Sequence, residues 1–181
     1  MQSVRDLYSI VSALKTTKRR GWIYKGMKSD VIASHIYGSM CIGLYLAKIE
    51  KVDSDKVTRM LLVHDWVMAK MEDVTPPSGK YNQKRQLEDK AKNVIADLLP
   101  QILRSEYLSL FKEFNDLKTP EAQVAREADK LETLMQGEFF EETTKDYKVL
   151  DTFFENYEEI FKTTTGKEIF SNLRQRDLAR N

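Results

Sequence analysis

The sequence is organised around residues 61–73, LLVHDWVMAKMED, an apolar run interrupted by a histidine and the acid that directly follows it. Apolar side chains return there at the steps of three and four that an amphipathic helix requires. The periodicity predicts one helix that is capped by Asp53 and ends near Asp73, where a Pro-Pro pair follows and withdraws backbone donors. This helix would carry His64 and Asp65 on or beside its buried stripe.

The rest of the chain shows the same helical periodicity and no alternating strand pattern. We therefore predict an all-α fold, a single compact bundle of about seven or eight helices that spans residues 1–181. A helix is expected to begin at Thr119, because a capping hydroxyl, a proline and an acid follow one another there. The other expected helices cover residues 4–17, 30–46, 53–73, 82–99, 102–114, 147–162 and 167–176. Residues 18–28, which contain several cations and two glycines, are predicted to form an ordered loop.

Length and composition suit one soluble globular domain. The chain has 181 residues, of which 41% are hydrophobic and 31% charged, enough for a sizeable core. Its net charge of only +1 does not indicate binding to a nucleic-acid polymer or to an anionic membrane, which large positive charges favour. The single cysteine excludes an intramolecular disulfide, and no segment reads as a signal peptide or a membrane span. We expect a cytoplasmic protein.

The chain has only two histidines, His35 and His64, and both fall in apolar helical runs. A third run places Asp129 between apolar neighbours, where burial is costly unless a cation receives the carboxylate. Together with Asp65, these residues would offer two imidazoles and two carboxylates to one divalent cation. Such a set suits Mn, Co, Fe, Ni or Zn better than calcium. The alternative is a helical protein without a metal, in which the histidines are packed core residues.

Ordered motifs connect the metal hypothesis to a known family. They are RRGW at 19–22, DVIASH at 30–35, HD at 64–65, DVTP at 73–76 and DKLETLMQ at 129–136. In this order they resemble the HD-domain metal-dependent phosphohydrolase superfamily and, within it, most closely the 5'-deoxynucleotidases. The resemblance implies one HD domain, with its motifs in about residues 14–136 and C-terminal helices in about 147–176. It also implies that His35, His64, Asp65 and Asp129 are ligands of a divalent metal.

The resemblance further implies an activity and a substrate site. The expected activity is metal-dependent hydrolysis of (deoxy)nucleoside 5'-monophosphates, small molecules, to nucleoside and phosphate. Arg19 or Arg20, together with Trp22, is expected near the phosphate and the sugar, Asp73 near the sugar hydroxyls, and Glu113 close to the site. The family resemblance also favours a homodimer.

One position departs from the family pattern. Where the family has the glutamate of His-Asp-x-x-Glu, close to the reacting water, this chain has Met68, which cannot carry a proton. Glu72 follows one helical turn later on roughly the same face, and it is a candidate catalytic carboxylate together with Asp73. If neither carboxylate replaces the missing one, the alternative is an HD protein that binds metal and nucleotide with weak or lost hydrolysis.

Overall fold

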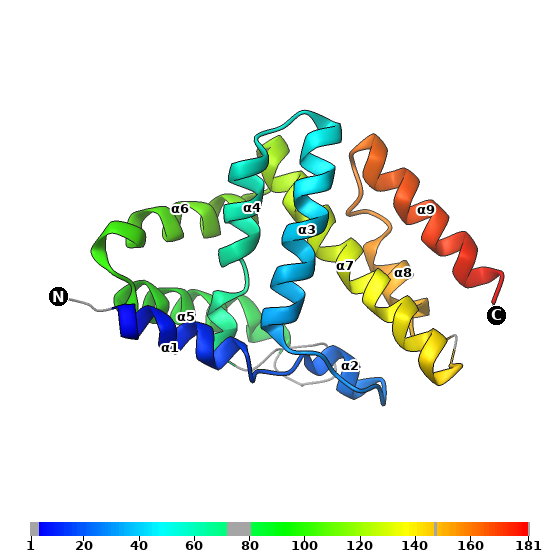
Figure 1. The fold of residues 1–181 in the computed structure, drawn as a ribbon, viewed down its shortest axis with the longest axis horizontal. Helices are drawn as coiled ribbons and strands as arrows, with labels where there is room; N and C mark the ends of the chain where they lie inside the picture. Colours follow the sequence, from blue (N-terminus) through cyan, green and yellow to red (C-terminus); the bar gives the residue numbers. More distant parts are fainter. Residues whose placement is uncertain (1–3, 72–80, 147, 181) are drawn as a thin grey trace. The chain divides into compact units, whose positions relative to one another are not determined.

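The computed structural model describes residues 4–71, 81–146 and 148–180. These residues form nine α-helices and two short 3-10 helices, with no strand among them beyond one backbone bridge between Lys18 and Val31 (Figure 1). The α-helices are α1 Val4–Leu14, α2 Arg20–Tyr24, α3 Ile32–Glu50, α4 Ser54–Val63, α5 Lys84–Leu98, α6 Gln101–Asp116, α7 Pro120–Thr144, α8 Asp151–Tyr157 and α9 Thr164–Leu178. The 3-10 helices are η1 Trp66–Ala69 and η3 Tyr81–Gln83. The predicted all-α class is confirmed.

The prediction of an ordered loop over residues 18–28 was wrong in part, because these residues contain α2. The helix that begins after Thr119 runs on to Thr144. Its predicted start is correct, since the Thr119 hydroxyl accepts a hydrogen bond from the Ala122 amide at 3.2 Å. None of the described helices is both long and apolar enough to cross a lipid bilayer.

The predicted helix over 53–73 was also wrong, because α4 ends at Val63 and η1 begins only at Trp66. His64 and Asp65 form the turn between the two helices. Val63, His64, Trp66, Val67 and Met68 are buried, and η1 packs against both α1 and α5. Glu72 and Asp73 lie outside the described residues.

Residue contacts divide the chain into two compact units, and the first comprises Met1–Ile36 and Leu62–Lys112. In its described residues η1 forms the centre of the core. The Trp66 ring stacks on the Tyr107 ring with 5.8 Å between their centroids. Ile10 of α1 and Ile95 of α5 are completely buried. The prediction of a single domain over the whole chain stays a prediction.

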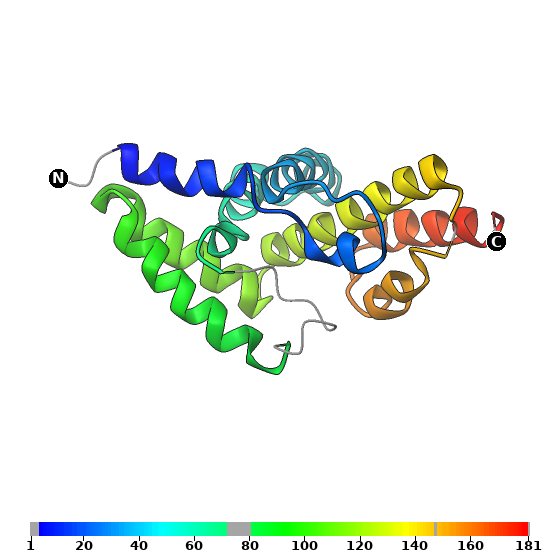
Figure 2. The ribbon, with the colours of Figure 1, turned by 90° about the horizontal axis from the view of Figure 1, so that it is seen from below.

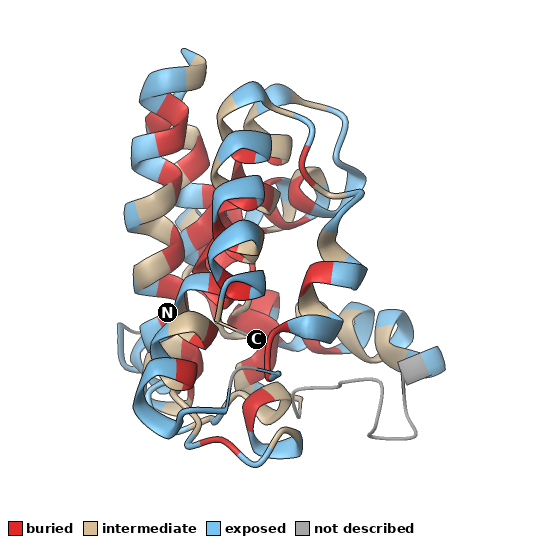
Figure 3. Cartoon of the chain, turned by 90° about the vertical axis from the view of Figure 1, so that its right-hand side faces the viewer, coloured by how far each residue is buried: buried red, intermediate tan, exposed pale blue. Residues whose placement is uncertain are grey.

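The second unit comprises Tyr37–Leu61 and Glu113–Asn181 and is built on α7. Helix α9 lies alongside α7 (Figure 2), and buried positions alternate with exposed ones along the helices (Figure 3). The fully buried Glu127 carboxylate accepts hydrogen bonds from the Gln123 side chain, from the backbone amides of Lys162 and Thr163 and from the Thr163 hydroxyl. Because Thr163 caps α9, Glu127 fixes the start of α9 on α7.

A buried pair of acids also joins α7 to α9. Glu141 is completely buried, Asp177 is nearly so, and their side chains are hydrogen bonded to each other. Glu141 Oε1 accepts a hydrogen bond from the Leu150 amide at 3.0 Å. Burial, reinforced by the neighbouring Asp177, raises the pKa of Glu141 to about 7, and burial raises the pKa of Asp177. As the pH rises, the unfolded chain therefore loses this proton at a lower pH than the folded protein does.

This pair predicts a stability that depends on pH. Its contribution is complete below the ordinary pKa of glutamate, 4.5, and is lost as the pH rises through about 7. Glu141→Gln keeps an acceptor for the Leu150 amide and removes the titration. We expect it to unfold at higher urea than the wild type at pH 8, by a free energy on the order of 1 kcal/mol, and to show a flatter pH profile between pH 5 and 8.

Urea unfolding followed by circular dichroism measures both profiles. Glu155→Gln is the matched control, because Glu155 is exposed on α8 and should keep the wild-type slope. Equal pH slopes for Glu141→Gln and the wild type would show that the pair holds no extra proton.

Candidate metal centre

His35 lies in the first turn of α3, and the chain before this helix fixes its position. The Ile32 amide donates a hydrogen bond to the Thr17 carbonyl at 2.9 Å, and the Arg19 amide donates to the Asp30 carbonyl at 3.2 Å. These bonds tie the start of α3 to the segment that precedes α2. The His35 side chain is 2% exposed and is therefore held inside the first unit.

The turn after α4 brings His64 and Asp65 to His35. The two imidazole rings meet edge to face, with 5.5 Å between their centroids. Asp65 Oδ2 lies 3.8 Å from Nε2 of His35 and 3.6 Å from Nε2 of His64. On a regular helix adjacent side chains point about 100° apart. The break in the helix is what allows His64 and Asp65 to face the same point.

The chemistry and spacing of these donors fit a cation. The two Nε2–Oδ2 distances are longer than a direct hydrogen bond. Two donors that each lie about 2.1 Å from one ion are separated by about 3.0 Å at a right angle and about 3.4 Å at a tetrahedral angle. The spacing is therefore close to that of ligands around a single ion. Two buried imidazoles and one partly exposed carboxylate also leave one side accessible.

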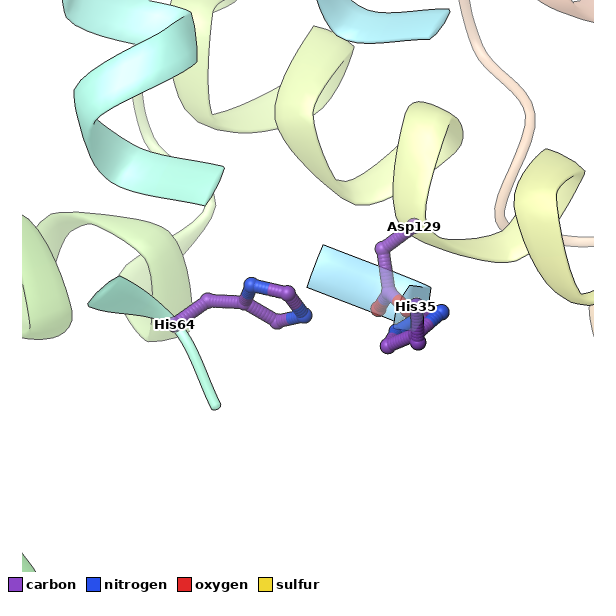
Figure 4. A group of neighbouring side chains, drawn as sticks. All are labelled: His35, His64 and Asp129. Carbon is purple, nitrogen blue, oxygen red and sulfur yellow. The ribbon is translucent and has the colours of Figure 1, made fainter. Parts of the chain in front are cut away.

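Asp129, the fourth predicted ligand, lies on α7 in the second unit, and Figure 4 draws its side chain with those of His35 and His64. Asp129 is 5% exposed, and its Oδ2 lies 3.0 Å from Nζ of Lys130 and 3.7 Å from Nη1 of Arg126. The two cations offset the cost of burying this carboxylate. Helical spacing from Asp129 could have indicated Arg126, which lies three residues earlier.

Arg19 packs against Trp22 beside the start of α3. Arg19 Nη1 lies 3.6 Å from Asp30 Oδ2, and its guanidinium carbon lies 5.5 Å from the centre of the Trp22 ring. Trp22 is 1% exposed, so its ring supports Arg19 from within the core and offers no open face to a base. The guanidinium of Arg19 is thereby held in a defined orientation.

Arg20 lines a pocket of about 700 Å³ in the first unit. The pocket has a volume typical of sites for small molecules. Its other lining residues are Thr17, Lys18, Ile23, Met68, Ala69, Lys70 and Met71. Sequence reasoning missed Lys18 and Lys70, because they are far apart in the chain and surface lysines are common.

Glu113 stands at a junction of helices in the second unit. Its carboxylate lies 2.7 Å from Nζ of Lys56 and accepts a hydrogen bond from the Thr119 hydroxyl at 2.5 Å. Burial alone would raise the pKa of Glu113, but Lys56 and Thr119 outweigh it and lower the pKa. Glu113 therefore carries a negative charge that links α4, α6 and the start of α7.

Comparison with known proteins assigns the chain to a family. The sequence model of the family described as HD domain matches residues 11–173. The chain belongs to the HD domain family. The matched range includes all four residues that the sequence predicted as metal ligands.

Relatives of this HD-domain chain agree with that assignment. The 5'-deoxynucleotidase HDDC2 of Dictyostelium discoideum is 31% identical over 150 residues, which cover 78% of this chain and 79% of that protein. A solved structure from Pyrococcus horikoshii is 28% identical, with a TM-score of 0.75 over 99% of this chain and 100% of that one. A Magnetospirillum magnetotacticum structure, named a predicted metal-dependent phosphohydrolase, shares the fold with a TM-score of 0.75 at 24% identity, over 99% of this chain and 94% of that one. The predicted resemblance to the HD-domain phosphohydrolases and their 5'-deoxynucleotidase branch is confirmed.

Proposed function

We propose that this HD-domain protein is a metal-dependent phosphomonoesterase that hydrolyses (deoxy)nucleoside 5'-monophosphates to nucleoside and phosphate. The observation that carries the proposal is the convergence of His35, His64 and Asp65, in a family whose relatives include a 5'-deoxynucleotidase. Asp129 would complete the ligand set, as the family resemblance implies. The mixture of imidazoles and carboxylates favours Mn, Co, Fe, Ni or Zn as the cation.

The donor set defines what the centre would contribute. When bound, a divalent cation supplies an activated water near neutral pH and polarises a phosphoryl oxygen. His35 and His64 would be neutral imidazoles, because a ligand nitrogen must be free of its proton. Arg126 and Lys130 lie next to Oδ2 of Asp129, and their positive charges favour the ionised carboxylate that a metal ligand requires.

The arginines would bind the phosphate. A guanidinium presents a planar fork of donors that matches phosphate oxygens. Arg19 is pre-oriented by Asp30 and by the Trp22 ring, so less conformational freedom is lost when it binds. Arg20 would add a second positive charge from the adjoining pocket. We assign the sugar hydroxyls to Asp73, as the family resemblance implies. We assign the movement of protons to Glu72 and Asp73, as substitutes for the family glutamate that Met68 replaces.

Phosphate release from a nucleotide panel tests the proposal. Protein stripped with EDTA and reloaded with Mn²⁺ or Co²⁺ should release phosphate from deoxynucleoside and ribonucleoside 5'-monophosphates, and fresh EDTA should stop the release. Nucleoside 3'-monophosphates are the control substrates and should be cleaved far more slowly. Protein that retains the metal but turns over no 5'-monophosphate would refute the proposed activity.

We also propose that the protein works as a homodimer in the cytoplasm, as the resemblance to 5'-deoxynucleotidases implies. Sedimentation equilibrium at micromolar concentration should give a mass twice that of the chain. A single species with the mass of one chain would refute the dimer.

A further inference from the structure

The pocket of the first unit has a strongly one-sided charge. Among the lining residues that fall within the described ranges, three are cations, Lys18, Arg20 and Lys70, and none is an acid. Lys18 and Lys70 form no ion pair with any residue of the ranges that the structure describes, 4–71, 81–146 and 148–180. Cations that converge on a concave surface without carboxylates raise the local concentration of anions. The pocket therefore favours an anionic ligand.

The lining of the pocket also has an apolar part. It comprises Ile23, Met68, Ala69 and Met71, here called the methionine wall, and Met68 is only 6% exposed. Methionine side chains adapt to flat or irregular partners. A ligand that is anionic in one part and carries a sugar or a base in another would match this mixed lining.

Backbone hydrogen bonds tie the pocket to the elements that carry the proposed metal ligands. Thr17, in the pocket wall, accepts a bond from Ile32, which begins α3 three residues before His35. Met68, in another wall, donates from its amide to the Asp65 carbonyl at 3.0 Å. Residues of the pocket lining and the proposed ligands His35 and Asp65 therefore lie on backbone segments that are joined by direct hydrogen bonds.

We propose that this pocket binds a second phosphoryl group, so that the preferred ligand is a nucleotide with two separate phosphates, such as a nucleoside 3',5'-bisphosphate. The proposal rests on the proposed function and narrows its substrate class. With a monophosphate, the part of the ligand beyond the metal centre is a neutral nucleoside, which gives Lys18 and Lys70 no partner. A second phosphate would pair with both lysines. The methionine wall would hold the sugar and the base.

The test compares two probes on the full chain in EDTA, where no hydrolysis can intervene. Isothermal titration with deoxyadenosine 3',5'-bisphosphate and with deoxyadenosine 5'-monophosphate gives the ratio of the two dissociation constants. We expect the bisphosphate to bind at least about tenfold more tightly, with a preference that weakens as salt is added. In Lys18→Ala/Lys70→Ala the ratio should fall close to one.

The matched control is Lys15→Ala/Lys28→Ala, which removes the same charge from exposed lysines outside the pocket lining. This control should keep the wild-type ratio. Equal affinities for the two probes, no binding of either probe, or a ratio unchanged in Lys18→Ala/Lys70→Ala would overturn the proposal. Metal-dependent release of phosphate from the monophosphate is measured separately. If no phosphate is released, the proposed function is rejected, whereas the binding preference for the bisphosphate is judged only from the titrations.

Discussion

Replacing His64 by asparagine is expected to abolish tight binding of the divalent cation and, with it, nucleotide hydrolysis. Nε2 of His64 lies 3.6 Å from Asp65 Oδ2 and is the atom that faces His35 and Asp65. Asparagine keeps a polar group near the position of Nδ1 but has no atom at the position of Nε2. Because changes to residues that merely support a ligand already cost 10- to 100-fold in metal affinity, loss of a ligand should cost more than about 100-fold.

Two measurements check this result. Elemental analysis after gel filtration should find metal in the wild type and in Leu62→Ala, and none in His64→Asn. Leu62 is a suitable control, because it lies on α4 two residues earlier and is 40% exposed. Added Mn²⁺ should raise the unfolding temperature of the wild type and of the control but not that of His64→Asn. If His64→Asn retains one metal per chain with the wild-type affinity, His64 is a packed core residue and the proposed centre is wrong.

How much of the fold could be predicted from the sequence depended on the kind of signal that each helix carries. Apolar periodicity located α1, α3 and α7, because apolar residues return in each at helical spacing. The cap at Thr119 was equally clear, since its residue types satisfy backbone donors that any helix start exposes. The periodicity failed at Val63, where α4 ends with neither glycine nor proline to mark the break. There the backbone follows the burial of η1 against α1 and α5, which is tertiary information.

The same limit applies to the candidate site. The identities of His35, His64, Asp65 and Asp129 could be read from residue chemistry and from the order of the motifs. Their mutual geometry could not, because His64 and Asp65 would diverge on the helix that the sequence predicted. The pocket is a harder case. Lys18 and Lys70 line the same pocket only after the chain has folded, and neither belongs to a motif.

Restoring a carboxylate by Met68→Glu is expected to raise the turnover of nucleoside 5'-monophosphates by about 10- to 100-fold, within the range that a positioned acid or base contributes. Met68 lies on η1, three residues after Asp65, and lines the pocket together with Arg20 and Lys70. A glutamate there would place a proton acceptor close to the metal centre, as in the family pattern. The two cations would offset the cost of placing its charge at a position that is 6% exposed.

Met68→Gln distinguishes the effect of the carboxylate charge from the effect of side-chain size, because glutamine has the size of glutamate and no charge. Steady-state kinetics should show the increase for Met68→Glu alone, in the turnover number more than in KM. The new charge should also lower the preference for the bisphosphate, since it would stand beside Lys70 and repel the second phosphate. A wild type that already turns over rapidly, with Met68→Glu unchanged in both rate and preference, would mean that Glu72 and Asp73 fully replace the missing family glutamate. In that case residue 68 belongs only to the wall of the pocket.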